Sequence, residues 1–208
     1  MILLKKPLVI IANGDFPEHS TPLKKLKNAK CIVACDGAVD LLEKKGFSPD
    51  VIIGDLDSIS RKNKEKYKEI IIEAEDQSEN DLRKAINYCI QNKIEKLTII
   101  GASGKREDHT IGNIFSLLYY SNLNIKLLTD TGTFKCISGN QKIKSFKGQK
   151  VSLFSDDRTI KVTSKGLKYN FNKSFITSLF YGTLNESKCK NIDVGLSHGS
   201  ILIYQSHK

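Results

Sequence analysis

The segment DVIIGDLDSI, residues 50–59, decides how the fold is interpreted, because an apolar run ends directly in two carboxylates. Its run VII, residues 51–53, is entirely β-branched, which is typical of a buried strand. Asp55 and Asp57 follow at once, two residues apart. Like charges this close raise each other's pKa unless a cation lies between them. The segment therefore predicts a buried strand with a carboxylate pair at its carboxyl end.

Similar apolar runs precede and follow this one along the first 130 residues. They are LVIIA (8–12), CIVAC (31–35), EIIIEA (69–74), LTIIG (97–101) and IKLLT (125–129). The segments between them can hold helices, and strands that alternate with helices indicate an α/β fold with a mostly parallel sheet. We therefore expect an α/β domain over residues 1–133.

The texture changes after about residue 133, where no long helical pattern remains. Short strand candidates separated by turn residues are VSLFS (151–155), TIKVT (159–163), SFITSLFY (174–181), IDVGL (192–196) and SILIY (200–204). Closely spaced short strands are typical of an all-β domain. We expect a smaller, sandwich-like β domain over residues 134–208.

Two segments have the apolar spacing of an amphipathic helix. The first begins near Asn80, with a capping signal formed by Ser78 and Asp81; its predicted apolar face holds Leu82, Ala85, Ile86, Cys89 and Ile90. The second begins near Thr110, and its predicted face holds Ile111, Ile114, Phe115 and Leu118.

Composition excludes several functional classes. The net charge is +10, but only four of the 33 basic residues are Arg, and the Lys residues are spread over the whole chain, which favours a solvated surface over a nucleic-acid interface. Five cysteines without a CxxC pair indicate reduced thiols and no zinc. The start MILLKKPLVIIANGD has too short an apolar run for a signal peptide or a membrane span. We expect a soluble cytoplasmic protein that does not bind membranes.

Five polar clusters each follow an apolar run: ANGD (12–15), ACDGA (34–38), GDLDS (54–58), EDQSEND (75–81) and GASGKREDH (101–109). The carboxyl ends of parallel strands share one edge of a sheet, where ligands bind. A single Asx residue also serves an ordinary turn. A turn does not need two acids on the same side of an extended strand end. Such a pair indicates a bound cation instead, and Mg²⁺ is the simplest candidate.

The last cluster resembles a phosphate-binding loop only superficially. Its GxxGKR pattern lacks the spacing and the hydroxyl of GxxxxGK[ST], which excludes the P-loop mechanism. Arg106 nevertheless offers a planar fork for phosphate. Asp108 and His109 form a candidate acid/base or orienting pair, although His109 could equally cap or pack against a helix.

Together these clusters resemble the motif set of the thiamin pyrophosphokinase family. The matching segments are GDLDSI, DQSENDLRKAI and GASGKREDHTIGNI in this order, and ACDGA is similar to the family's Asp-Gly-Gly-Ala segment. In the second half, GLKYNF (166–171), GTLNES (182–187) and HGSILIY (198–204) resemble the family's β domain. The resemblance covers nearly the whole chain. It implies Mg²⁺-dependent transfer of the pyrophosphoryl group of ATP to the hydroxyl of thiamin, which gives AMP and thiamin diphosphate.

The resemblance also implies roles for individual residues. The Mg²⁺ ligands would be Asp55, Asp57 and Asp81. The catalytic residues would be the three metal ligands together with Arg106, Asp108 and His109. The ATP site would include Asn13, Asp36, Gly37, Gly54, Ser58, Asp76, Gly101 and Arg106. The thiamin site would include Gln77, Asn80, Asp108, Tyr169, Thr183 and Asn185.

Two departures from the family pattern concern the thiamin site. Tyr169 stands where the family has Trp, and Leu184 precedes Asn185 where the family has Ser, which leaves Thr183 or Ser187 as a substitute hydroxyl. In the family this site lies between the two domains at a dimer interface, so the resemblance implies a homodimer. Two alternatives are a basic nucleic-acid enzyme that holds Mg²⁺ at GDLDS for phosphodiester cleavage, and a nucleotide-binding regulator without catalysis.

Overall fold

The computed structural model describes residues 4–74 and 79–208, which form two compact units. The α/β unit comprises residues 1–116 and 125–130, and the β unit comprises residues 117–124 and 131–208. Compactness does not by itself define a domain boundary along the chain, so the division into 1–133 and 134–208 stays a prediction.

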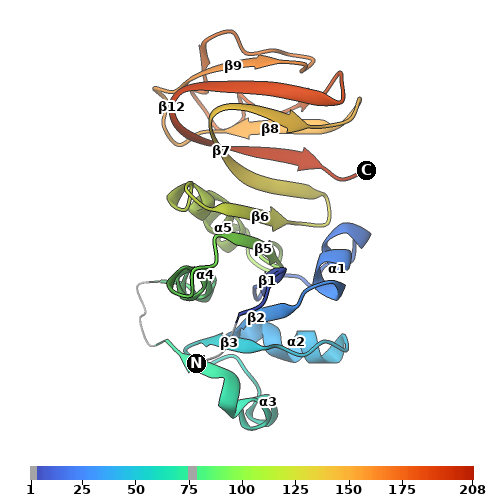
Figure 1. The fold of residues 1–208 in the computed structure, drawn as a ribbon, viewed down its shortest axis with the longest axis vertical. Helices are drawn as coiled ribbons and strands as arrows, with labels where there is room; N and C mark the ends of the chain where they lie inside the picture. The colour runs from blue at the N-terminus through green and yellow to red at the C-terminus, as the bar shows by residue number, and fades with distance from the viewer. Residues whose placement is uncertain (1–3, 75–78) are drawn as a thin grey trace. The chain divides into compact units, whose positions relative to one another are not determined.

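The α/β unit is built on one sheet with the strand order β6-β5-β1-β2-β3-β4 (Figure 1). Pairing is parallel between β1 and β2, β1 and β5, β2 and β3, and β3 and β4. The predicted parallel sheet is therefore confirmed, and each apolar run contains one strand. The strands are β1 (Leu8–Ile11), β2 (Cys31–Cys35), β3 (Val51–Gly54), β4 (Ile71–Glu73), β5 (Lys96–Ile100) and β6 (Asn124–Leu128).

Helices cover both faces of this sheet, with α1 and α2 on one side and α4 on the other (Figure 1). This explains why β1, β2 and β3 are buried along their whole length and are apolar without alternation. The helical elements are α1 (Ser20–Lys27), η1 (Asp36–Ala38), α2 (Val39–Lys44), α3 (Arg61–Lys66), η2 (Lys68–Ile70), α4 (Asp81–Gln91) and α5 (Glu107–Tyr119).

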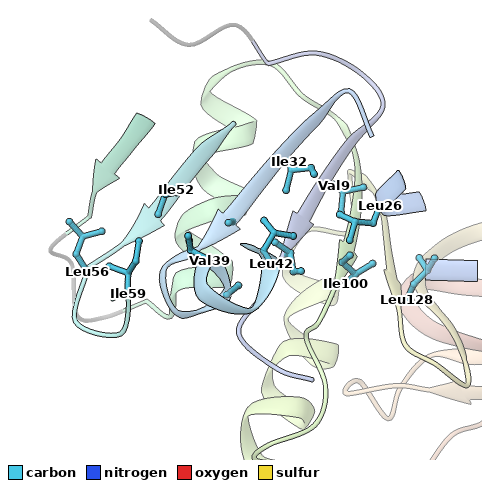
Figure 2. Close-up of a cluster of buried hydrophobic side chains, with 13 residues drawn as sticks. Val9, Leu26, Ile32, Val39, Leu42, Ile52, Leu56, Ile59, Ile100 and Leu128 are labelled. Carbon is cyan, nitrogen blue, oxygen red and sulfur yellow. The ribbon is translucent and has the colours of Figure 1, made fainter. Parts of the chain in front are cut away.

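One buried cluster connects the sheet to the loop that carries the acid pair. It contains strand residues such as Val9 and Ile52 together with Leu42 of α2. Leu56 and Ile59, from the loop after β3, belong to the same cluster and lie beside Ile52 in Figure 2. Burial of these two side chains holds the loop against the sheet.

The two helix predictions are confirmed in position but not in every buried residue. Helix α4 begins after Asn80, whose side chain caps it by accepting from the amide of Arg83; Ser78 lies outside the described residues. Ile90 is 39% exposed and not part of the apolar face. Helix α5 begins three residues before Thr110, and Ile111 is 58% exposed. Its buried residues include Asn113, Leu117 and, just past its end, Tyr120, so the buried face is rotated from the predicted one.

The β unit confirms the expected all-β character, with antiparallel pairing throughout. Strands β9 and β7 flank β12, and β8 pairs with β12 and β11. Its core holds side chains such as Ile137, Val162 and Ile201. The strands are β7 (Gly132–Lys144), β8 (Lys150–Phe154), β9 (Lys161–Lys165), β10 (Ser174–Phe175), β11 (Asn185–Glu186) and β12 (Asn191–Ser206).

Three strand predictions need correction here. SFITSLFY contains only the short strand β10, because Leu179, Phe180 and Tyr181 are exposed and have no core to face. IDVGL and SILIY are parts of one long strand, β12, interrupted by a register shift between Gly195 and Ser200. Strand β7 was not predicted, because its glycines and lysines obscure the alternation.

Within residues 4–74 and 79–208, no helix has the length and apolar character that crossing a membrane would require.

Candidate active site

Three carboxylates meet at the carboxyl ends of β2 and β3. Asp36 follows β2, Asp55 and Asp57 follow β3, and one oxygen of each lies within 4.8 Å of the other two. Asp36 is fully buried, and its Oδ2 accepts a 3.0 Å hydrogen bond from the amide of Ser58. Burial raises the pKa of Asp36, and the nearby charges of Asp57 and Asp55 raise it further. These three carboxylates are candidate ligands for one cation.

The donor set fits Mg²⁺. Among the described residues, Asp36 Oδ1 is the one buried side-chain polar atom without a hydrogen-bond partner. An orphaned buried oxygen costs about 1–3 kcal/mol. A hard divalent cation satisfies it, because Mg²⁺ takes carboxylate oxygens together with phosphate oxygens. Asp36, predicted only as a nucleotide contact, is therefore a candidate metal ligand.

A turn at Leu56 places the two acids of GDLDS. Leu56 has φ of +66° and is buried, so the chain turns here and does not continue as an extended strand end. The left-handed region is sparsely populated by non-glycine residues and persists where surrounding contacts enforce it. Burial of Leu56 and Ile59 in the core supplies those contacts. Ser58 Oγ donates to Asp57 Oδ1 at 2.6 Å and orients that carboxylate.

Asp81, the third metal ligand implied by the family, lies at the start of α4 close to this trio. A Cβ on Gly54 would lie 2.5 Å from Asp36 Cβ and 3.3 Å from Asp81 Cγ, so the glycine is needed for this close approach. Asp81 pairs with the buried Lys84 at 3.3 Å. Burial raises the pKa of Asp81, Lys84 lowers it, and Asp55 and Asp36 raise it. Its role as a ligand stays a prediction.

The loops after β1 and β5 are joined by backbone hydrogen bonds. The amide of Gly14 donates to Gly101 O at 2.6 Å, and that of Asp15 donates to Ser103 O at 2.8 Å. Gly101 has φ of +64°, and a Cβ there would lie 2.7 Å from Ala12 O. The two loops therefore form one rigid border of the sheet edge.

This border presents two cations, one of which the sequence did not single out. Lys105 donates to Asn13 Oδ1 at 2.7 Å, and the Asn13 side chain covers Gly37. Arg106 binds Asp108 through two of its nitrogens: Nε donates to Oδ1 at 3.1 Å and Nη2 donates to Oδ2 at 2.6 Å. The hydrogen bonds from Arg106 lower the pKa of Asp108 to about 2. Asp108 is therefore ionised at neutral pH.

The loop regions line one cavity of about 510 Å³ in the α/β unit. Asp55, Asp57 and Asp81 contribute carboxylates, and Lys105 and Arg106 contribute positive charge. Strands β3 and β5 are separated by β1 and β2, a span of roughly 14 Å at the usual strand spacing. The cavity thus has an acidic part and a basic part. Other predicted residues that line it are Asn13, Ser58, Asn80 and His109.

Asn113 was missed by sequence reasoning, although it borders the same cavity. It is buried on α5, donates from Nδ2 to Ala102 O at 3.0 Å, and accepts from Asn80 Nδ2 at 3.1 Å. It therefore joins α5, the β5 loop and the cap of α4. The sequence did offer one signal: Asn113 lies four residues before Leu117, so on a helix the two share a face, and a polar residue on a buried face needs hydrogen-bond partners.

In the β unit, Tyr169 is 61% exposed, with Lys168 Nζ 5.4 Å from its ring centroid. Asn185 is buried and holds this segment: its Oδ1 accepts from the amide of Tyr169 at 3.0 Å, and its Nδ2 donates to Tyr169 O at 2.7 Å. Thr183 Oγ1 donates to Phe180 O. Ser187 is fully buried and donates to Cys189 O, which leaves Thr183 as the accessible hydroxyl.

Two predicted residues, Asp76 and Gln77, lie outside the described residues. The assigned roles of the remaining residues stay predictions.

Comparisons with known proteins give one consistent result. Residues 23–129 match the family described as thiamin pyrophosphokinase, catalytic domain, and residues 132–204 match thiamin pyrophosphokinase, substrate-binding domain. Thiamine pyrophosphokinase 1 of Oryza sativa subsp. japonica is 34% identical over 154 residues, 66% of this chain and 57% of the rice protein. Thiamine pyrophosphokinase of Bacillus subtilis is 29% identical over 153 residues, 68% of this chain and 70% of that protein. The chain spans little more than half of the rice relative's length.

Solved structures share the fold. Thiamin pyrophosphokinase from Geobacillus thermodenitrificans superposes with a TM-score of 0.78 at 21% identity, covering 97% of this chain and 98% of that one. The enzyme from Candida albicans superposes with a TM-score of 0.79 at 20% identity, covering 96% and 89%.

Proposed function

The chain belongs to the thiamin pyrophosphokinase family, and we propose that it transfers the pyrophosphoryl group of ATP to the hydroxyl oxygen of thiamin, giving AMP and thiamin diphosphate. The observation that carries the proposal is the cavity in which Asp55 and Asp57, beside the buried Asp36, share a lining with Lys105 and Arg106. A phosphate chain with bound metal presents both negative oxygens and a cation, so it suits a cavity with both kinds of charge.

Mg²⁺ would be held by Asp36, Asp55 and Asp57, with Asp81 as the further ligand that the family resemblance implies. When bound, the metal supplies charge neutralisation for phosphate oxygens. The protein's role would be to hold these carboxylates in place before the metal binds. The Ser58 amide holds Asp36, and the buried turn at Leu56 holds the loop with Asp55 and Asp57.

Arg106 is proposed to bind phosphate oxygens with its planar fork. In the free protein that fork is occupied by Asp108, so phosphate binding exchanges one anionic partner for another. Asp108 or His109 would then orient the thiamin hydroxyl. Transfers of this kind depend mainly on positioning and charge stabilisation. The hydrogen bonds that join the loops after β1 and β5 support the proposed positioning.

Thiamin recognition is assigned to the exposed ring of Tyr169, with Thr183 as a hydroxyl contact. An electron-rich ring attracts a cationic, aromatic substrate by stacking or cation–π contact. The family membership favours this function over the nucleic-acid enzyme and over the regulator without catalysis. A homodimer and a cytoplasmic location stay predictions.

The test is a turnover assay with ATP labelled at the β-phosphorus, Mg²⁺ and thiamin. We expect all of the transferred label in thiamin diphosphate, and unlabelled AMP formed in an equal amount. ADP with thiamin monophosphate would mean ordinary phosphoryl transfer, and ATP binding without any AMP would favour the regulator. A control without thiamin measures background hydrolysis of ATP, and a second control with EDTA measures the dependence on metal.

A further inference from the structure

A second cavity, of about 900 Å³, lies in the α/β unit away from the acid trio. Lys6, Pro7, Leu8 and Val9 line it at the start of β1, and Lys96 and Thr98 line it from β5. These are the amino ends of the strands, whereas the candidate active site occupies their carboxyl ends. The remaining lining residues come from α1 and from Asn28 directly after it: Ser20, Thr21, Lys24, Lys25 and Asn28 follow one another at the spacing of a single helix face.

At this cavity, polar side chains occupy sheet and helix positions where apolar side chains would usually pack against each other. In β5, Leu97 and Ile99 are buried, while Lys96 and Thr98 alternate with them and point to the other face. Thr98 pairs in register with Val9 of β1. Helix α1 buries Pro22 and Leu26, which leaves its lysine face toward the cavity. The sheet face therefore carries polar and basic side chains at this end, next to the apolar residues Pro7, Leu8 and Val9.

Positive charge converges here without a matching carboxylate. Four lysines line the cavity and, among the residues the structure describes, no Asp or Glu does. Lys126 on β6 does not line the cavity but lies near two of its lysines: partial burial lowers the pKa of Lys126, and the charges of Lys25 and Lys96 lower it further. None of the five lysines forms an ion pair with a described residue.

We propose that this cavity, the lysine cavity, binds a small anion that carries several phosphate groups. Clustered ammonium groups repel one another unless an anion lies among them, and compact ammonium charges on flexible stems adapt to a phosphate chain. The hydroxyls of Ser20 and Thr21 and the amide of Asn28 add neutral donors. The apolar floor of Pro7, Leu8 and Val9 lowers the local dielectric constant and strengthens the attraction. The volume is in the usual range for small-ligand sites.

Lysine footprinting tests the proposal directly. The protein is modified with an amine-reactive reagent in about 150 mM salt, where exposed charges are largely screened, and each lysine is followed by mass spectrometry. With inorganic tripolyphosphate present, we expect Lys24, Lys25, Lys96 and Lys126 to react at least 3-fold more slowly. Exposed Lys62 and Lys64 on α3 serve as controls and should not change. Equal slowing at every lysine, or none at Lys24 and Lys96, would overturn the proposal.

A second arm uses metal-free ATP and separates the two sources of such an anion. Protection of Lys24 and Lys96 by both compounds indicates that nucleotides are accepted, whereas protection by tripolyphosphate alone indicates an inorganic chain. Protection of Lys105 reports the candidate active site separately, so the outcome does not depend on the proposed enzyme function.

Affinity measured by calorimetry completes the test. The double variant Lys24→Gln with Lys96→Gln should weaken tripolyphosphate binding at the lysine cavity at least 10-fold. Lys62→Gln with Lys64→Gln removes the same charge from α3 and should leave the affinity within 2-fold. Equal losses in the two double variants would show a diffuse charge effect and contradict a built site.

Discussion

Asp36 accepts a 3.0 Å hydrogen bond from the amide of Ser58 through one oxygen, while its other oxygen, fully buried, has no hydrogen-bond partner among the described residues. This contact joins the end of β2 to the loop after β3, which carries Asp55 and Asp57. The bond fixes the carboxylate, and the unsatisfied oxygen marks the position where a cation would be stabilised. If the trio binds a metal as proposed, this unsatisfied oxygen lowers the stability of the metal-free protein.

Asp36→Asn is expected to stabilise the metal-free protein by about 1 kcal/mol, because the buried charge is removed and the new amide faces the nearby carboxylates of Asp55 and Asp57, which can accept from it. An aspartate whose pKa is raised by folding binds its proton more tightly when folded. The wild type therefore loses stability as the pH rises from about 4 toward that raised pKa, and the variant does not. The gain should be larger at pH 7 than at pH 4.

Urea unfolding in EDTA at both pH values measures this difference. Saturating Mg²⁺ should reverse the order, since it stabilises the wild type by mass action and binds the variant poorly. A variant that is less stable in EDTA, or that gains as much from Mg²⁺ as the wild type, would remove Asp36 from the metal site.

Asp57→Asn is expected to lose at least ~100-fold in turnover while the fold persists, because one strong electrostatic contact to the metal is removed. Asp57 is exposed and outside the core, so circular dichroism and the unfolding midpoint should hardly change. Asp156→Asn, an exposed aspartate in the β unit, is the matched control. Near-normal activity of a folded Asp57→Asn protein would disprove the assignment.

Asn113→Ala is expected to destabilise the α/β unit by about 1–3 kcal/mol, since Ala102 O and Asn80 Nδ2 both lose their buried partner. The candidate site should suffer as well, because Asn113 joins three segments that border it. Chemical denaturation measures the loss. Ser116→Ala, one helical turn away, removes only the hydroxyl bond to Asn113 O and should cost less. Equal costs would assign both effects to the helix alone.

Tyr169→Ala is expected to raise the KM for thiamin roughly 10-fold, equivalent to ~1.4 kcal/mol, within the range for stacking on an aromatic ring. The KM for ATP should hardly change, because the ATP site is assigned to the α/β unit. Tyr169→Phe keeps the ring and should behave nearly as the wild type. Because the Tyr169 ring is exposed, we expect Tyr169→Ala to leave the stability of the β unit nearly unchanged, and thermal unfolding checks this.

If Tyr169→Ala raises both KM values equally, or unfolds the β unit, the ring has no specific contact with thiamin. The backbone of this segment is held independently by Asn185, so truncation of the ring should leave the loop in place.

The strands of the α/β unit were predictable because β-branched runs are local signals, and each predicted run contains a strand. The glycine- and lysine-rich strand β7 was not, because its pattern becomes clear only through pairing with β12. The buried face of α5 was also not predictable from its own sequence, because it depends on which side packs against the rest of the unit. Ile111 satisfies helical spacing, but the burial of Asn113 and Leu117 decides which side packs.

At the candidate site, the loops that carry the acids and bases could be read from the sequence, since polar clusters that follow parallel strands share one sheet edge. Three features became visible only in the folded chain: Asp36 joins Asp55 and Asp57, Lys84 pairs with Asp81, and the chain turns at Leu56. The physical reason is that strand identity depends on neighbouring residues, whereas a carboxylate's partners and its access to water depend on segments far away in the chain that packing brings within a few ångströms.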